Sequence, residues 1–433
     1  MYKNKSEHHN GGFFLSFQKY VESFEKRTVK EKVSPELDLT REAKKDLSQP
    51  VYFPNFPGGE SIVNLWATRE RVGKALGVKK EEIVDLLADA VGDLSEPREV
   101  EEAPIKENHI DNFDLRDYPI PKYYPKDGGR YITSGVVLAE YEGVRNLSFH
   151  RMMLIDEDKF TIRLVPRNLH RMYKEAMDND DELRIAVAIG LEPAVLLAGA
   201  TSVDFDVDEL KIANSLKRKG TGKDIEVTRI EDGLIVPAEA EYVLEGKIID
   251  ELDDEGPFVD ITSTYDHVRQ QPVVEIERIW HRDDPIFHAL LPGGYEHFLL
   301  MGLPRESVMK RKVDEVTKVK DARLTEGGCS WLHGVVSIDK QNDDEPERAI
   351  KAAFEGHTSM KKVTIVDEDV DIFNDDEVEW AVATRFQPDE DIYVYEDQKG
   401  SSLDPSAPDL TAKWGIDATK PWEGEEFDRA ELQ

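Results

Sequence analysis

The sequence predicts an α+β protein of three regions, because the periodicity of its apolar residues changes twice along the 433-residue chain. The first region has mainly helical spacing. The middle has short runs rich in Val, Ile, Tyr and Thr, and the last alternates between the two patterns. A chain of this length is too long for one ordinary core, so two or three domains are expected.

The N-terminal region, residues 1–112, is predicted to be α/β. The spacing of its first aromatic and apolar residues indicates an amphipathic helix: Phe13, Phe14, Phe17, Tyr20, Val21 and Phe24. Two further helices are expected at residues 67–78, ended by Gly77, and at residues 79–94. A charged, proline-containing stretch at residues 94–111 indicates a linker, so the first boundary is placed after residue 112.

The central region, residues 113–295, is predicted to be a mixed, mostly antiparallel sheet or barrel with helices, and not a doubly wound fold. Runs rich in β-branched and aromatic residues predict its strands: residues 131–141, 160–166, 225–230, 234–250 and 272–281. Helical spacing interrupts these runs at residues 169–180 and 207–219.

The C-terminal region, residues 296–396, returns to α/β alternation. Strand-like and helix-like segments alternate there: residues 331–340, 347–357, 361–372 and 377–386. The remaining residues, 397–433, are rich in Gly, Ser, Pro and Asp at their start and predict an extended arm.

The composition restricts the partners and the compartment. The 56 basic and 90 acidic residues give a net charge of −34, which disfavours nucleic acid as a partner. Such a surface either keeps the protein soluble or reflects a salt-rich cytoplasm that screens the charge. One cysteine, Cys329, cannot form an internal disulfide, and neither a membrane helix nor a secretory signal is evident. A cytoplasmic protein is therefore expected.

Common catalytic signatures are absent from the sequence. No G-x-G-x-x-G follows a strand, and residues 217–224 lack the first glycine and the Ser/Thr of a P-loop. There is no H-E-x-x-H, no paired C-x-x-C and no G-x-S-x-G. Cys329 is better interpreted as a small buried hydrophobe than as a nucleophile. Conventional zinc enzymes, serine hydrolases and kinases are thus disfavoured.

Two short segments carry residue types suited to chemistry. In the first, Asn146 can ligate a hard cation and Arg151 can hold a carboxylate through two parallel hydrogen bonds. In the second, a Gly-Pro turn separates Glu255 from Asp260 and can bring both carboxyl groups to one site, where burial and repulsion would raise one pKa and prepare a proton donor. Each segment alone also fits an ordinary solvated surface, since acidic pairs at this spacing are common in so acidic a chain.

Together, in this order, these segments resemble the UbiD family of decarboxylases, which carries N-x-S-x-x-R and later E-G-P-[FY]-x-[ED]. Five further stretches are similar to family motifs and follow the family order: residues 64–78, 236–248, 326–338, 380–388 and 413–422. The resemblance spans about residues 60 to 422. It implies a UbiD-like fold, with a central flavin-binding split β-barrel between N-terminal and C-terminal α/β domains.

The resemblance implies prenylated FMN, supplied by a separate flavin prenyltransferase and bound through its phosphate by a divalent metal, usually Mn²⁺, with K⁺ nearby. Asn146 and Glu209 match the metal-binding residues of the family. Ser148 falls where the family contacts the flavin, and Arg385 falls at its phosphate-contacting arginine. Arg151, which is also expected to contact the cofactor, forms the family's catalytic set with Glu255 and Asp260.

One departure from the family concerns the third metal ligand. Many relatives place a histidine just after a proline, in the segment that matches residues 165–170. By spacing from Pro166, Asn168 takes that position and His170 lies two residues on. The Asn168 oxygen could substitute, His170 could take over, or Asn146, Glu209, phosphate and water could suffice.

In the implied mechanism, Arg151 holds the substrate carboxylate, Glu255 orients Arg151, and Asp260 supplies the proton that replaces CO₂ while the flavin acts as an electron sink. The substrate expected from the similarity to archaeal members is trans-anhydromevalonate 5-phosphate, which yields isopentenyl phosphate for isoprene biosynthesis. The alternatives are decarboxylation of an aromatic acid, such as a 4-hydroxybenzoate derivative, and a flavin-binding protein without catalysis.

A phosphorylated substrate needs a second basic cluster. Four residues are available in the sequence for it: Arg130, Lys217, Arg218 and Arg282. Family members form oligomers, so a homo-oligomer is expected, with contacts through the C-terminal region.

Overall fold

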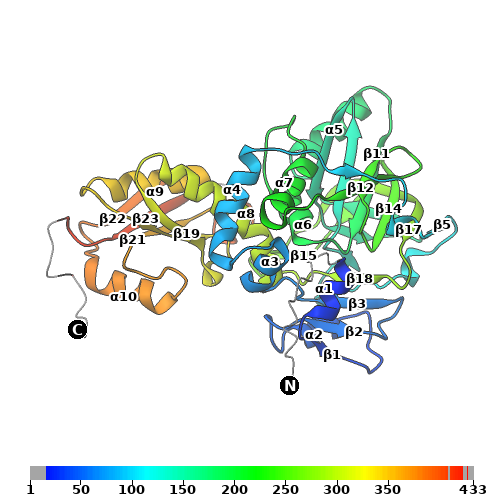
Figure 1. Ribbon diagram of the computed structural model, residues 1–433, viewed down its shortest axis with the longest axis horizontal. Coiled ribbons are helices and arrows are strands. Elements are labelled where there is room, and N and C mark those ends of the chain that lie inside the picture. Colours follow the sequence, from blue (N-terminus) through cyan, green and yellow to red (C-terminus); the bar gives the residue numbers. More distant parts are fainter. Residues whose placement is uncertain (1–15, 408–409, 423–426, 428–433) are drawn as a thin grey trace, which may run out of the picture.

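The computed structural model describes residues 16–407, 410–422 and 427. Its three regions follow one another in space, with the N-terminal strands and the large central sheet on one side of helix α8 and the C-terminal sheet on the other (Figure 1). Helices and sheets are mixed throughout, which confirms the α+β prediction.

The first helix begins at a residue whose hydroxyl caps it. Ser16 precedes α1 (Phe17–Ser23), and its side chain accepts a hydrogen bond from the Lys19 backbone N–H. The apolar side of α1 is buried, as its helical spacing predicts. The predicted positions Phe13 and Phe14 lie outside the described residues.

A four-stranded sheet joins the N-terminal region to a segment far along the chain. Its strands follow the order β1 (Arg27–Thr28), β2 (Val51–Phe53), β3 (Glu60–Val63) and β18 (Ile286–Ala289). Strand β18 runs parallel to β3, so the N-terminal sheet is completed only by the end of the central region. The helices of this region are α2 (Asp38–Ala43), α3 (Arg69–Leu76) and α4 (Ile83–Gly92). As predicted, α3 ends at Gly77, which adopts a positive φ of 76°.

The central region is built on a nine-stranded antiparallel sheet, in the order β6–β9–β10–β17–β14–β11–β7–β8, with β5 paired to β17. The strands have these bounds: β5 (Asn108–Ile110), β6 (Tyr131–Ile132), β7 (Val136–Tyr141), β8 (Val144–Phe149), β9 (Met152–Leu154), β10 (Lys159–Ile162), β11 (Leu183–Ile189), β14 (Tyr242–Glu255) and β17 (Arg269–His281). The prediction of a mostly antiparallel sheet is confirmed.

Smaller elements surround this sheet. A three-stranded sheet has the order β13 (Ile235–Pro237), β12 (Glu226–Arg229) and β4 (Arg98–Glu99), and a hairpin pairs β15 (Phe258–Val259) with β16 (Tyr265–Asp266). The helices are α5 (Asn168–Asp178), α6 (Pro193–Ala200) and α7 (Glu209–Thr221). Helices α5 and α7 occupy the two segments where helical spacing interrupts the strand pattern. Three short 3₁₀ helices precede the sheet: η1 (Lys80–Glu82), η2 (Pro104–Lys106) and η3 (Leu115–Asp117).

The large sheet lies between two hydrophobic cores. Along β11, Ile185 and Val187 belong to one core, whereas Ala186 and Ala188 belong to the other. This division follows from the alternation of side chains along a strand. Because both faces are covered there, the five residues of β11 from Ile185 to Ile189 are all apolar and buried.

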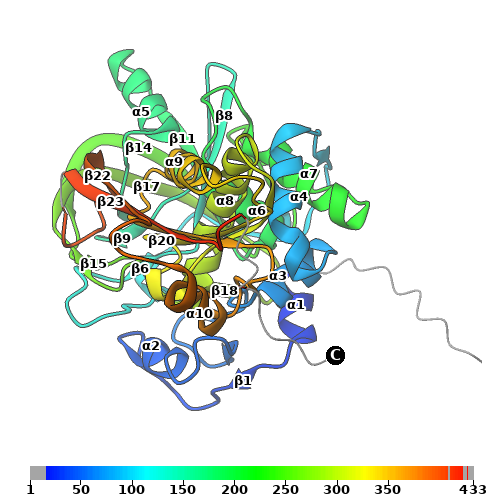
Figure 2. The ribbon, with the colours of Figure 1, turned by 90° about the vertical axis from the view of Figure 1, so that its left-hand side faces the viewer.

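The C-terminal region is a five-stranded sheet flanked by helices, in the order β19–β20–β21–β23–β22. Its elements have these bounds: α8 (Tyr295–Asp314), β19 (Val319–Leu324), η4 (Glu326–Gly328), β20 (His333–Ile338), α9 (Glu345–Gly356), β21 (Lys362–Asp367), α10 (Asp375–Arg385), β22 (Ile392–Lys399) and β23 (Leu410–Ala418). Helices α9 and α10 pack on opposite faces of the sheet (Figure 2). None of the helices in the described ranges is long and apolar enough to cross a bilayer.

The prediction of an extended arm after residue 396 is wrong for residues 410–418. They form β23, which pairs parallel with β21 and antiparallel with β22 inside the sheet. The Gly-, Ser-, Pro- and Asp-rich composition belongs to the connection between β22 and β23, and it hid the strand that follows. The last strand is therefore an interior strand.

Candidate active site

A cavity of about 850 Å³ lies where the central and C-terminal regions meet. The central region contributes the turn after β8, the segment that leads from β10 into α5, and the connection between α6 and α7. The C-terminal region contributes one face of α8 and residues 358–359 and 399–403. The cavity has the size of a site for a cofactor together with a small substrate.

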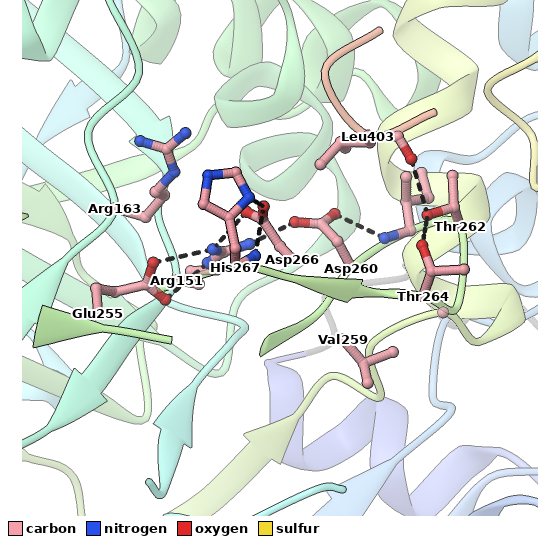
Figure 3. A network of polar contacts seen from close by, with 12 residues as sticks. Arg151, Arg163, Glu255, Val259, Asp260, Thr262, Thr264, Asp266, His267 and Leu403 are labelled. Atoms are coloured by element: carbon pink, nitrogen blue, oxygen red, sulfur yellow. Dashed lines mark hydrogen bonds and ion pairs between the residues drawn. The ribbon is translucent and has the colours of Figure 1, made fainter. Parts of the chain in front are cut away.

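Arg151 is the centre of the polar network in this cavity (Figure 3). It lies in the turn between β8 and β9. Its Nε and one terminal nitrogen each donate a hydrogen bond of 2.9 Å to Glu255, so the two side chains form a bidentate pair. The guanidinium also donates to Asp260 at 2.6 Å and to Asp266 at 2.9 Å. One cation thus holds three carboxylates together.

The strand ends explain why these side chains meet. Glu255 is the last residue of β14 and is fully buried, and the Tyr131 hydroxyl donates to it at 3.1 Å. The Gly-Pro turn then leads into the β15–β16 hairpin, which places Asp260 after its first strand and Asp266 at the end of its second. The structure therefore brings together the predicted set of Arg151, Glu255 and Asp260.

Charge and burial act in opposite directions in this network. Burial disfavours the charge on Arg151, but its bonds to Glu255 and the nearby carboxylates raise its pKa above the usual range. Burial likewise opposes the charge on Asp266, yet Arg269 and Arg151 lower the pKa of that carboxyl to about 2. The guanidinium and Asp266 are therefore both ionised near neutral pH.

A second polar cluster joins β8 to the first turn of α7. Asn146 donates from its amide to Glu209 at 2.9 Å, and the Leu147 backbone N–H donates to the same carboxylate at 2.9 Å. The Ser148 hydroxyl donates to the Asn146 amide oxygen at 2.8 Å. Three predicted cofactor contacts, Asn146, Ser148 and Glu209, thus lie side by side on the cavity wall.

This cluster suits a hard cation. Asn146 and Glu209 are each 2% exposed, and no Lys or Arg within the described part of the chain forms an ion pair with Glu209. Burial raises the pKa of Glu209 to about 8, since a buried carboxylate without a cation is costly. A divalent metal would supply the missing positive charge, and the Asn146 and Glu209 oxygens are ligands that a hard cation prefers.

The third metal ligand has a clear geometric candidate. Asn168, at the start of α5, lines the cavity, and its amide donates to the Val203 carbonyl at 3.4 Å. His170 does not line the cavity and lies half-buried on α5. No group of three or more His, Cys, Asp and Glu side chains across the described ranges is arranged to hold a metal. Of the two side chains predicted as alternatives for the third ligand, the structure places Asn168 on the cavity wall and His170 away from it, because helical rotation over two residues separates them.

Arg385 lies away from the cavity. It ends α10 and donates to Asp367 and Asp369 at 2.7 Å. Its guanidinium connects α10 to the end of β21 and does not line the cavity in which the cofactor phosphate is expected.

The cluster predicted for a substrate phosphate is also dispersed. Arg130 donates to backbone carbonyls, Lys217 pairs with Glu192, Arg218 with Asp224, and Arg282 with Glu239. None of these four basic residues lines the cavity.

Sequence reasoning missed several residues that line the cavity. The basic ones are Arg163, Arg167, Arg305 and Lys399. Asp266 could have been found, because a hairpin over residues 258–266 returns Asp266 opposite Phe258. The basic residues come from three separate parts of the chain, namely the connection from β10 to α5, helix α8 and the end of β22, and no local signal connects these parts.

Models of three domains match most of the chain. They are the N-terminal, Rift-related and C-terminal domains of 3-octaprenyl-4-hydroxybenzoate carboxy-lyase, at residues 25–91, 98–295 and 298–418. The anhydromevalonate phosphate decarboxylase of Methanocaldococcus jannaschii is 45% identical over 93% of this chain and 96% of its own length. The enzyme of the same name from Methanosarcina mazei is also 45% identical, over 93% of this chain and 94% of its own.

Two solved structures with the same fold contain flavin. The UbiD-class enzyme HmfF from Pelotomaculum thermopropionicum, in complex with FMN, superposes with a TM-score of 0.93 at 36% identity and covers 96% of this chain and 97% of its own. An evolved dimeric form of that enzyme, in complex with prenylated FMN, has a TM-score of 0.89 at 35% identity and the same coverage. The predicted UbiD-like fold is confirmed.

Proposed function

Because this chain belongs to the UbiD family of decarboxylases, we propose that it uses prenylated FMN to convert anhydromevalonate phosphate into isopentenyl phosphate and CO₂. The observation that carries the chemistry is the bidentate pair of Arg151 with Glu255, next to Asp260, on the wall of the cavity. The choice of substrate is supported by the 45% identity to enzymes named for it.

Arg151 binds the substrate carboxylate in this proposal, and Glu255 fixes the plane of the guanidinium. Without substrate, Arg151 holds Asp260 and Asp266. An incoming carboxylate competes for the same donors. Asp266 keeps its second cation, Arg269, at 2.6 Å, so Asp260 is the group that gives way.

Asp260 then donates the proton. Once its contact with Arg151 is lost, the carboxylic acid form of Asp260 is able to protonate carbon. The substrate loses CO₂ and gains this proton at the same carbon, so the reaction is redox-neutral. When bound, prenylated FMN supplies an electron sink for the electrons left by CO₂.

The cofactor is assigned to the cluster beside this network. Asn146, Glu209 and the Asn168 oxygen would hold a divalent metal, for which Mn²⁺ is proposed, and the metal would bind the flavin phosphate. Ser148 would orient Asn146 through its hydrogen bond. We also propose a K⁺ ion nearby, maturation by a separate flavin prenyltransferase, a cytoplasmic location, and assembly into a homo-oligomer through the C-terminal region.

The test is release of CO₂ by protein matured with the prenylated cofactor. We expect turnover of anhydromevalonate phosphate and none of a panel of aromatic acids, with isopentenyl phosphate identified by mass spectrometry. Turnover of 4-hydroxybenzoate derivatives instead would establish the alternative substrate. Bound flavin without turnover of any unsaturated acid would show a non-catalytic flavin protein.

A further inference from the structure

Two arginines of the cavity share one hydroxyl group. Arg167, which precedes α5, donates to the Ser202 Oγ at 2.5 Å, and Arg305, on α8, donates to the same atom at 2.6 Å. Ser202 lies in the connection between α6 and α7, so three separate elements meet at this point. All three side chains line the cavity.

The pair carries positive charge without a counter-charge. Across the described ranges, neither Arg167 nor Arg305 forms an ion pair with a carboxylate, whereas Arg151 in the same cavity pairs with three. The Arg305 Nε is buried and has no hydrogen-bond partner among the described residues. Burial and the nearby Arg167 lower the pKa of Arg305 to about 10. Two cations held this close favour an anion between them.

The position of the pair suits the far end of a substrate. On α8, His297, Met301 and Arg305 line the cavity at successive turns. His297 lies near Asp260, as their electrostatic interaction shows. At 1.5 Å per residue, Arg305 is about 12 Å along the helix from His297.

The segment before α5 also leads from the Arg151 network to this pair. The Arg163 backbone N–H donates to the Arg151 carbonyl at 3.1 Å. From Arg163 the chain continues to Arg167 through a bend, in which the Arg167 backbone N–H donates to the Val165 carbonyl at 2.7 Å. Arg163 and Arg167 both line the cavity, so this segment, like α8, connects the Arg151 network to the arginine pair.

We propose that Arg167 and Arg305, bridged by Ser202, bind the phosphate of the substrate while Arg151 binds its carboxylate. This inference rests on the proposed function and names the residues that select a phosphorylated acid. The cofactor phosphate is assigned to the metal at Asn146, Glu209 and Asn168, and the flavin content of the variants distinguishes a second dianion at this pair from the cofactor phosphate itself. Arginine suits the role because its planar donors bind two phosphate oxygens at once.

The experiment uses matured holoenzyme and the variants Arg167→Gln, Arg305→Gln and Arg305→Lys. For each Gln variant we expect KM for anhydromevalonate phosphate to rise roughly 10- to 100-fold, because each variant loses one charge-assisted hydrogen bond to the phosphate. Flavin content, measured by absorbance, stays at the wild-type level. Turnover of the unphosphorylated acid stays unchanged, and Arg305→Lys recovers part of the affinity because it keeps the charge.

A binding assay separates this inference from the proposed function. Calorimetry with 3-methylbutyl phosphate and 3-methylbutanol as probes should show that the phosphate ester binds the wild type and that each Gln variant weakens it by a similar factor. The matched control is Arg348→Gln, an exposed arginine of α9 whose nearest carboxylate oxygen is 3.4 Å away. Unchanged KM and ester affinity in both Gln variants would overturn the inference, as would loss of flavin, which would assign the pair to the cofactor. A wild type that binds the ester but does not decarboxylate anhydromevalonate phosphate would refute only the proposed function.

Discussion

Asp260 and Asp266 both bond to Arg151, but they differ in their other partners. Asp266 has Arg269 as a second cation, whereas the other oxygen of Asp260 accepts, among the residues that the structure describes, only from the adjacent Ile261 backbone N–H. The residue that can leave Arg151 at the smaller electrostatic cost is therefore Asp260. This asymmetry supports Asp260 as the proposed proton donor among the three carboxylates.

The first prediction concerns this proton. Asp260→Asn keeps the size of the side chain and its acceptor oxygen but removes the acid, so kcat should fall by about 10²- to 10⁴-fold. Flavin content should remain at the wild-type level, because Asp260 belongs to the Arg151 network and not to the Asn146–Glu209 cluster. Asp253→Asn, on an exposed residue of β14, is the control and should keep full activity. Full activity of Asp260→Asn would exclude it as the donor.

The second prediction concerns the metal. Glu209→Ala and Glu209→Gln should both lose most of the bound flavin, because each removes the negative charge that a divalent cation requires. The Gln variant keeps an acceptor for the Leu147 backbone N–H, so its fold should be intact by circular dichroism. Dialysis of the wild type against EDTA should release flavin to a similar extent. Glu182→Ala, on an exposed carboxylate, is the control; retention of flavin by both Glu209 variants would contradict the assignment.

At the scale of elements, the sequence predicts best what is local. Helix α7 could be predicted because Leu210, Ala213 and Leu216 recur at helical spacing and are buried. Strand β23 could not, since a turn-rich connection precedes it and its partner β21 is more than forty residues earlier. The local sequence of one strand does not reveal which distant strand it will pair with.

In the candidate active site, too, contacts between residues close in sequence could be predicted and contacts between distant residues could not. The meeting of Glu255 and Asp260 could be predicted, because one turn and one short strand separate them. The meeting of Arg167 with Arg305 could not, because it depends on how α8 packs against the segment before α5. The separation of His170 and Arg385 from the cavity was equally hidden, since a motif gives a position in the chain and not the direction of a side chain.

The third prediction concerns the junction of α1, β14 and β18. Glu241, buried at this junction, accepts from the Ile286 backbone N–H at 2.9 Å and from Gln18 at 3.2 Å. Burial raises its pKa from 4.5 to about 7. Between these values the folded state binds more protons than the unfolded chain, so stability falls as pH rises through this window.

Glu241→Gln removes this titration. Between pH 5 and pH 7.5, the free energy of unfolding of the wild type should fall relative to the variant by on the order of 2 kcal/mol, measured by urea titration. Glu182→Gln, on an exposed residue, is the control and should follow the wild type. Parallel curves for the wild type and Glu241→Gln would show that the carboxyl does not titrate in this range.

At the scale of the whole molecule, the net charge of −34 is the dominant feature. Self-repulsion of this size opposes the compact state, and salt shortens its range from about 10 Å at 0.1 M to about 3 Å at 1 M. The fourth prediction is that Tm rises by several degrees between 0.1 M and 1 M KCl. NaCl should act equally, since screening does not depend on the cation. A Tm that falls with both salts would show that ion pairs outweigh the repulsion.

The place of β23 inside its sheet has a consequence during synthesis. Strands β19 to β22 can leave the ribosome before β23, but β21 and β22 have no common neighbour until residues 410–418 emerge. The residues 399–403 that close one wall of the cavity lie just before this strand. Nascent chains that stop short of residue 410 would expose two unpaired strand edges, which are targets for chaperones and for aggregation. The catalytic chamber is therefore completed only after residues 410–418 have been translated.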